Sequence, residues 1–189
     1  MNRTSTSVAA IAMIVAVAFA SPAMATEVYQ TSVEFISETF AEGKPVAKAV
    51  WVTGDLKQRV AKVLGHDYRD IRVRYWTLEN RSAWILEEIG KVEPITLGVV
   101  VEDGHIEEVK VLTYRESRGF EIRFPFFMDQ FRGARVDAGN KLDRSIDGIS
   151  GATLSVRATT KLARIALLLE RHTENGVKRA SAETQTKTP

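Results

Sequence analysis

The sequence contains no cysteine among its 189 residues. A disulfide is therefore excluded, and packing alone must hold the fold together. The same absence excludes a haem attached through a C-x-x-C-H motif and an iron–sulfur cluster, because both need cysteine side chains. Any redox group in this chain must be held by other residues.

A strong excess of charge of one sign is also missing. Lys and Arg number 26 against 24 Asp and Glu, which gives a formal net charge of +2 at pH 7. Domains that bind nucleic acid usually show a marked basic excess, so we expect no nucleic-acid partner. The three histidines, His66, His105 and His172, lie far apart without metal-ligand spacing, so no metal site is predicted.

The first 25 residues have the pattern of a secretory signal peptide. Arg3 is followed by an apolar run from Val8 to Ala20 and then by the small residues Ala23 and Ala25. A retained membrane anchor is the alternative, but the run is shorter than the about 20 residues that a spanning helix needs. We therefore expect residues 1–25 to be removed and the mature chain to be periplasmic, either free or docked at the inner membrane.

Hydrophobic periodicity predicts helices first, then antiparallel strands, then a long helix. Apolar spacings of three and four predict helices, alternation predicts strands, and Asp103-Gly104 is a strong hairpin signal. The predicted helices cover 29–43, 54–65 and 153–172, and the predicted strands cover 71–78, 82–90, 94–102, 105–114, 119–127 and 141–146. The polar tail, residues 173–189, is expected to be disordered. This order indicates a single α+β domain in which helices pack on a twisted antiparallel sheet.

The stretch "DGISGATLSV", residues 147–156, stands immediately before the last helix. A glycine-containing loop that leads into a helix offers free backbone N–H groups and the positive end of the helix dipole, which together favour a phosphate. Gly148 and Gly151 permit close approach of the backbone, and Ser150, Thr153 and Ser155 add hydroxyl groups. A plain helix start needs only one capping side chain, so this crowding favours phosphate binding.

"D-G-I-S-G-A-T" resembles the motif D-x-x-S-G-A-T of the FMN-binding domain family. That family includes the periplasmic flavin subunits of the sodium-translocating NADH:quinone reductase and of the Rnf complex. The resemblance implies that FMN is joined through a phosphodiester to Thr153. It also implies an FAD-dependent flavin transferase that makes this bond and reads Asp147. The candidate cofactor-binding residues of this stretch are Ser150, Gly151, Ala152, Thr153 and Ser155.

The resemblance continues upstream and covers residues 94–172, whereas residues 26–93 carry no motif that we can assign. Where many family members read E-T-P-G-L-G, this chain has Glu116-Ser117-Arg118-Gly119, without the proline and the second glycine. Glu116 and Ser117 are candidate cofactor contacts, and a solvated turn is the alternative. "FFMDQFRG" is similar to the family's Phe-x-x-Gln-Phe-x-Gly segment. Its phenylalanines could flank a flavin ring, but clustered Phe residues more often form a core.

The resulting hypothesis is an exported flavoprotein that relays electrons and has no catalytic residues of its own. Its expected partners are a membrane quinol, reductase or redox complex and an extracytoplasmic acceptor such as a cytochrome. The first alternative is a non-redox module that binds a phosphate-containing ligand reversibly at the helix N-terminus. The second is a hydrolase, since "GISGA" approaches G-x-S-x-G. Downstream of Ser150, however, Glu170 and His172 stand two apart on a helix and point in different directions, so no triad can form.

Overall fold

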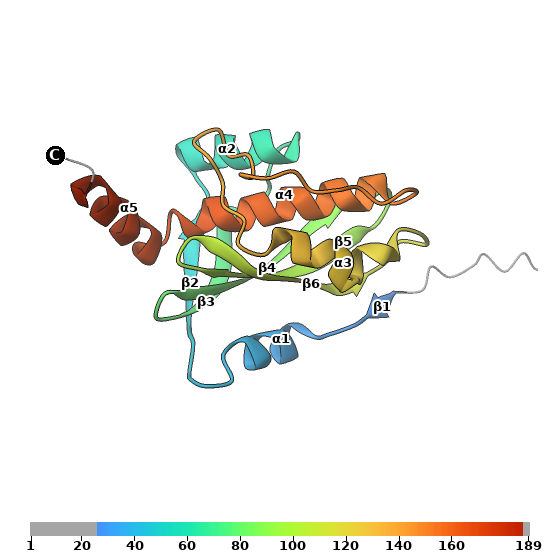
Figure 1. The fold of residues 1–189 in the computed structure, drawn as a ribbon, viewed down its shortest axis with the longest axis horizontal. Helices are drawn as coiled ribbons and strands as arrows, with labels where there is room; N and C mark the ends of the chain where they lie inside the picture. The colour runs from blue at the N-terminus through green and yellow to red at the C-terminus, as the bar shows by residue number, and fades with distance from the viewer. Residues whose placement is uncertain (1–25, 187–189) are drawn as a thin grey trace, which may run out of the picture.

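The computed structural model describes residues 26–186, and the expected signal peptide lies outside the described residues. Six strands form one sheet in the order β1-β6-β5-β4-β3-β2, and every neighbouring pair is antiparallel (Figure 1). The strands are β1 (Glu27–Val28), β2 (Val46–Trp51), β3 (Arg72–Leu78), β4 (Arg81–Ile89), β5 (Pro94–Glu102) and β6 (His105–Tyr114). The strands of residues 26–93 thus belong to the same sheet as β5 and β6, which lie in the region of the family resemblance, residues 94–172.

Helices cover both faces of this sheet. The long helix α4 packs across β4, β5 and β6 with α2 beside it, and α1 packs on the opposite face against β4 and β5 (Figure 1). The helices are α1 (Ser32–Thr39), α2 (Gly54–Leu64), η1 (Phe120–Arg123), α3 (Pro125–Met128), η2 (Asp129–Phe131), α4 (Thr153–Glu170) and α5 (Glu174–Thr186). The predicted α+β class is confirmed. Within residues 26–186, every helix is too short or too polar to cross a membrane.

The central strand β5 explains why the sheet needs helices on both faces. Seven consecutive residues of β5 are buried, because α4 covers one face and α1 the other. A side chain at Gly98 would collide with the ring of Phe35 from α1, since its Cβ would lie 2.6 Å from Phe35 Cζ. The apolar run of β5 therefore fixes a three-layer arrangement of helix, sheet and helix.

The predicted turn between β5 and β6 is confirmed. Asp103 and Gly104 both have positive φ, at 50° and 77°, as a two-residue hairpin with the right-handed strand twist requires. In the turn between β3 and β4, Glu79 also has a positive φ, of 53°. The turn between β5 and β6 is thus explained by the Asp103-Gly104 pair that the sequence analysis identified.

Two predicted strands are wrong, and two strands, β1 and β2, were missed. Residues 119–127 form η1 and the start of α3, because Gly119 at φ 91° breaks the extended chain and Pro125 begins a helix. The expected strand at 141–146 amounts to one bridge between Val136 and Leu142. Of the two missed strands, β1 pairs with the end of β6, and β2 pairs with β3 along its whole length.

The tail was expected to be disordered, but residues 174–186 form α5, and that expectation was wrong. The Thr173 hydroxyl accepts a hydrogen bond from Gly176 N–H at 3.1 Å and so stabilises the first turn. Arg179 makes two hydrogen bonds to Glu170, at 2.9 and 3.1 Å, and the Glu170 side chain is only 3% exposed. A local cap and a buried ion pair therefore order a segment that has few apolar residues.

Candidate functional site

The motif residues lie at the N-terminus of α4, which begins at Thr153. The helix is held in place by its buried apolar stripe, which includes Leu162, Ile165 and Leu169. Ala152 precedes the helix, no side chain caps it, and the first turn contains no acidic residue. The free N–H groups and the positive helix end are thus available to an anion.

The backbone before α4 is open on its outer side. Gly151 has φ of 82°, and no atom lies within 4 Å of the position that a Cβ would take there. Ala152 N–H donates to Ile149 O at 3.0 Å and closes the turn that presents Thr153. Thr153 itself is exposed, so its hydroxyl is accessible to another molecule.

A pocket of about 630 Å³ lies against this turn and joins two segments that are far apart in the sequence. Such a volume is typical of small-molecule sites, which measure about 300–1,000 Å³. The pocket is lined by Lys91, Glu116, Ser117, Arg118, Gly151, Ala152, Thr153, Leu154 and Ser155. Six predicted site residues are therefore together here, whereas Ser150 and Asp147 are exposed and lie outside this lining.

Glu116 fixes the turn between β4 and β5. Its carboxylate accepts hydrogen bonds from the N–H groups of Lys91, Val92 and Glu93, the last two at 2.6 and 3.0 Å. Burial works against the charge of Glu116, but the three backbone N–H groups outweigh it and hold the pKa of this carboxyl below its ordinary value. Glu116 therefore serves the pocket by positioning the turn that carries Lys91.

Ser155 is tied to the neighbouring loop by Tyr114, a residue that the sequence reasoning did not identify. The Ser155 and Tyr114 hydroxyls lie 2.9 Å apart, and Tyr114 donates to Arg118 O at 2.5 Å. A Cβ on Gly119 would lie 2.6 Å from Ser155 Oγ, so this loop packs directly on the first turn of α4. The only signal for Tyr114 in the sequence is its position as the last inward-facing residue of the predicted strand 105–114.

Asp147 is supported through its backbone. Its N–H donates to Gln130 Oε1 at 2.7 Å, and Gln130 belongs to the "FFMDQFRG" segment. The phenylalanines of this region divide into two kinds: Phe127 and Phe131 are fully buried core residues, whereas Phe124 and Phe126 are exposed. None of the four lines the pocket beside Thr153.

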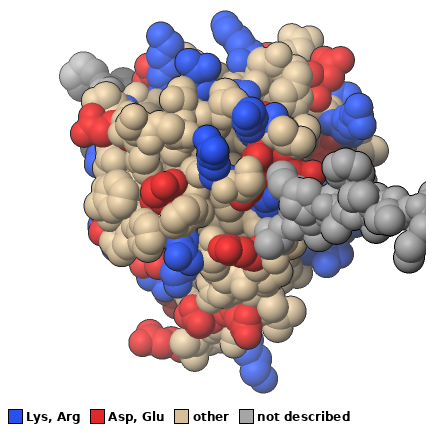
Figure 2. Space-filling view, turned by 90° about the vertical axis from the view of Figure 1, so that its right-hand side faces the viewer, with Lys and Arg blue, Asp and Glu red and all other residues tan. Residues whose placement is uncertain are grey.

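The pocket lies at one end of the molecule. The start of β1, the loop before η1 and the start of α4 all lie at the right-hand end of Figure 1. Figure 2 looks onto that end, where Lys and Arg side chains alternate with Asp and Glu among uncharged ones.

These residues fit a phosphate ester joined to the protein. Lys91 and Arg118 line the pocket as cations, the first turn of α4 offers N–H donors, and Thr153 supplies an exposed hydroxyl. Backbone donors, two cations and a hydroxyl group in one pocket suit the binding of a phosphate.

Comparisons with known proteins find a family model and a solved structure that resemble this chain. The model of the FMN-binding domain family matches residues 90–168, so this part of the chain is similar to that family. No curated protein matches the sequence. Among solved structures, the crystal structure of NqrC from Shewanella oneidensis is similar, with 13% identity and a TM-score of 0.43 over 80% of this chain and 88% of that one.

Proposed function

We propose that this protein is an exported flavoprotein that carries FMN on Thr153 through a phosphodiester and relays electrons. The observation that supports this most directly is the position of Thr153. It is the exposed first residue of an uncapped helix, at a pocket lined by both segments of the family resemblance. The match of residues 90–168 to the FMN-binding domain family supports the choice of ligand.

Each residue would have a distinct role in holding the flavin. The first-turn N–H groups of α4, with Lys91 and Arg118, would bind the phosphate, and Glu116 and Tyr114 would hold the two loops in register. Thr153 Oγ1 would lose its proton and gain the bond to phosphorus, with AMP leaving from the FAD donor. FMN, when bound, supplies one- and two-electron chemistry.

The partners follow from this chemistry. The bond needs an FAD-dependent flavin transferase outside the cytoplasm, which would recognise Asp147 in the exposed part of the motif. Because the sequence has no cysteine for a thioether-linked haem or an iron–sulfur cluster, the flavin would serve as the redox group. Electrons would arrive from a membrane quinol, reductase or redox complex and leave to a periplasmic acceptor such as a cytochrome.

The test is the mass of the intact protein after export in the presence of the transferase. Wild-type protein should be heavier than its bare chain by one FMN less one water and should stay yellow when denatured. Thr153→Ala should lose this mass, because alanine has no hydroxyl. Ser150→Ala is the matched control, since it removes a neighbouring hydroxyl that lies outside the pocket lining and should keep the mass.

Two results would contradict the proposal. A Thr153→Ala protein that still carries FMN would show that the attachment residue is wrong. A wild-type protein that takes up flavin only reversibly, even with the transferase, would instead support the phosphate-binding module.

A further inference from the structure

Extended segments pair with the outer edge of β6 only at its two ends. β1 pairs with Thr113 and Tyr114, and the Gly133–Ala134 segment exchanges hydrogen bonds with Ile106 at 2.7 and 2.9 Å. Among the described residues, no strand pairs with residues 107–111 on this side of β6. A stretch of sheet edge with unpaired main-chain groups is a template for another extended chain.

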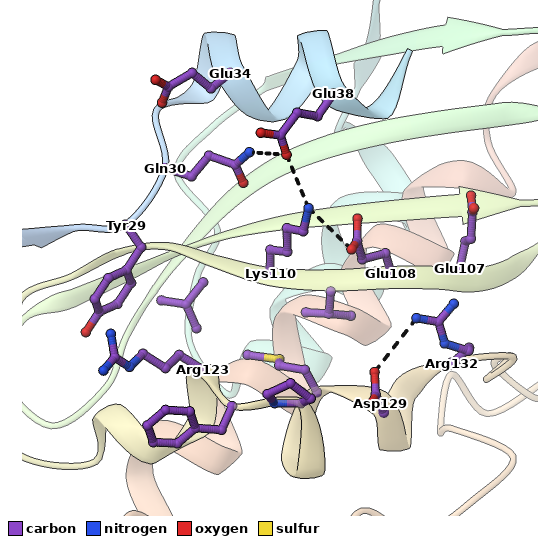
Figure 3. Close-up of a pocket in the computed structure, with 15 residues that line it drawn as sticks. Tyr29, Gln30, Glu34, Glu38, Glu107, Glu108, Lys110, Arg123, Asp129 and Arg132 are labelled. Carbon is purple, nitrogen blue, oxygen red and sulfur yellow. Dashed lines mark hydrogen bonds and ion pairs between the residues drawn. The ribbon is translucent and has the colours of Figure 1, made fainter. Parts of the chain in front are cut away.

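A cavity of about 720 Å³ lies along this open stretch (Figure 3). Residues 107–111 line its floor, Glu34 and Glu38 of α1 stand on one side, and residues 123–125, 128 and 129 stand on the other. Figure 3 shows Lys110 and Glu108 pointing toward α1. Val109 and Val111 are buried on the side of α4. From Glu108 to Val111 the side chains thus alternate between the groove and the side of α4, after a register shift at Glu107.

The groove carries more acid than base. Its lining contains Glu34, Glu38, Glu107, Glu108 and Asp129 against Lys110, Arg123 and Arg132. Lys110 already pairs with Glu38 and Glu108, each at 3.4 Å, and Arg132 pairs with Asp129. Glu107 is paired with Arg81, which lies outside the lining, and a small excess of negative charge remains after these ion pairs are formed.

Glu107 provides an unmet hydrogen-bond acceptor at this groove. Its Oε1 accepts from Arg81 at 2.6 Å, but its Oε2 is buried and has no partner among the described residues. Burial is the main cause that raises the pKa of Glu107, and the nearby Arg81 opposes it. A buried carboxylate oxygen without a donor is costly, and a donor from a bound molecule would remove that cost.

We propose that this groove binds an extended, basic segment of a partner protein, which adds as a strand to the outer edge of β6. Five extended residues span about 17 Å and would pair with the main-chain groups of residues 107–111 that face away from β5. Lysine or arginine side chains of the segment would lie against Glu34, Glu38 and Glu107. Because α1 and α3 flank the edge, a single extended chain fits better than the edge strand of a second copy.

The charges on the edge explain why such pairing would be selective. Edge strands are commonly protected by charged residues and by bulges, and β6 has Lys110 and an irregular register between Val100 and Val101 near Glu107. A segment of the wrong charge would meet uncompensated carboxylates. The groove also shares no lining residue with the pocket beside Thr153, so the two proposals are independent and are tested separately.

The test uses the purified full chain and three synthetic peptides. The probe is acetyl-Thr-Lys-Val-Lys-Val-Lys-Thr-amide. One control replaces its lysines by glutamate, and the other has N-methyl groups on alternate backbone nitrogens. Calorimetry should show binding of the probe and at least about tenfold weaker binding of both controls. Hydrogen exchange should slow at residues 107–111 when the probe is bound.

A pair of charge variants locates the site on the protein. Glu38→Lys should weaken probe binding about fivefold or more, because Glu38 lines the groove. Glu42→Lys makes the same charge change next to α1 but outside that lining and should leave binding unchanged. Three results would overturn the proposal: absence of probe binding, equal binding of the N-methylated peptide, or an equal effect of the two variants.

Discussion

Replacing Glu116 by alanine tests whether the pocket beside Thr153 depends on the turn between β4 and β5. The carboxylate accepts from three successive N–H groups, and its removal leaves those donors to water or to nothing. An unsatisfied buried donor costs about 1–3 kcal/mol. Since Lys91 and Val92 are exposed and water can reach part of the turn, we expect a total loss of about 2–4 kcal/mol.

Glu116→Gln removes the charge of the side chain but keeps its shape, so it measures the contribution of the charge alone. The amide oxygen can still accept, but bonds to a charged acceptor are roughly twice as strong as neutral ones, so we expect a loss of about 1–2 kcal/mol. The first assay is denaturant unfolding at pH 7 of apoprotein. The second is the flavin content, measured by intact mass, of the same variants exported in the presence of the transferase. If Glu116→Ala unfolds at the wild-type denaturant concentration, the three hydrogen bonds do not hold the turn and the reasoning fails.

The pH dependence gives a second check on the same residue. The pKa of Glu116 is lowered in the folded protein, so its contribution is present above the unfolded value of about 4.3 and is lost as pH falls through the folded value. The stability difference between wild type and Glu116→Gln should therefore be largest near pH 7 and shrink below about pH 4. An undiminished difference at pH 3 would contradict the assignment of the lowered pKa.

Two further substitutions probe the contact between the loop and α4. Gly119→Ala should lower the free energy of unfolding by about 2–4 kcal/mol, because φ is 91° and the new Cβ would collide with Ser155 Oγ. Gly148→Ala is the control: its new Cβ meets open space, so the loss should be less than about 1 kcal/mol. Thermal melts of both proteins check this, and equal losses would refute it. Tyr114→Phe should cost about 1–2 kcal/mol by removing the hydroxyl that joins Arg118 O to Ser155, and it should slow flavin attachment. Unfolding curves and a time course of intact mass measure the two effects.

The parts of the fold that the sequence predicted depend on neighbouring residues. Asp103-Gly104 adopts the two positive φ angles that a tight hairpin needs, so this turn is readable from two letters. The apolar stripe from Leu154 to Leu169 predicts α4, because its period is that of a helix. The position of Thr153 at a helix start follows from the same local pattern.

The parts that failed depend on contacts between distant residues. The segment 119–127 alternates like a strand, but Gly119 packs against Ser155 and turns the chain before any strand can form. Gln130 supports Asp147, and Glu116 binds the N–H groups of residues 91–93, across separations that no periodicity encodes. The pocket is therefore assembled by tertiary packing, although its motif was visible beforehand.

In the C-terminal tail, a single buried charge explains why a segment whose composition predicts disorder forms a helix. Glu170 is almost fully buried at the end of α4, and Arg179 of α5 is the cation that pairs with it. Removing one partner of a buried ion pair costs about 3–5 kcal/mol, so Arg179→Ala and truncation after Thr173 should both lower the melting temperature clearly. Adding Glu170→Gln to Arg179→Ala should recover part of the loss, because no unpaired charge would then remain. A truncated protein that melts like the full chain would show that α5 does not stabilise the domain and that the disordered tail was the better description.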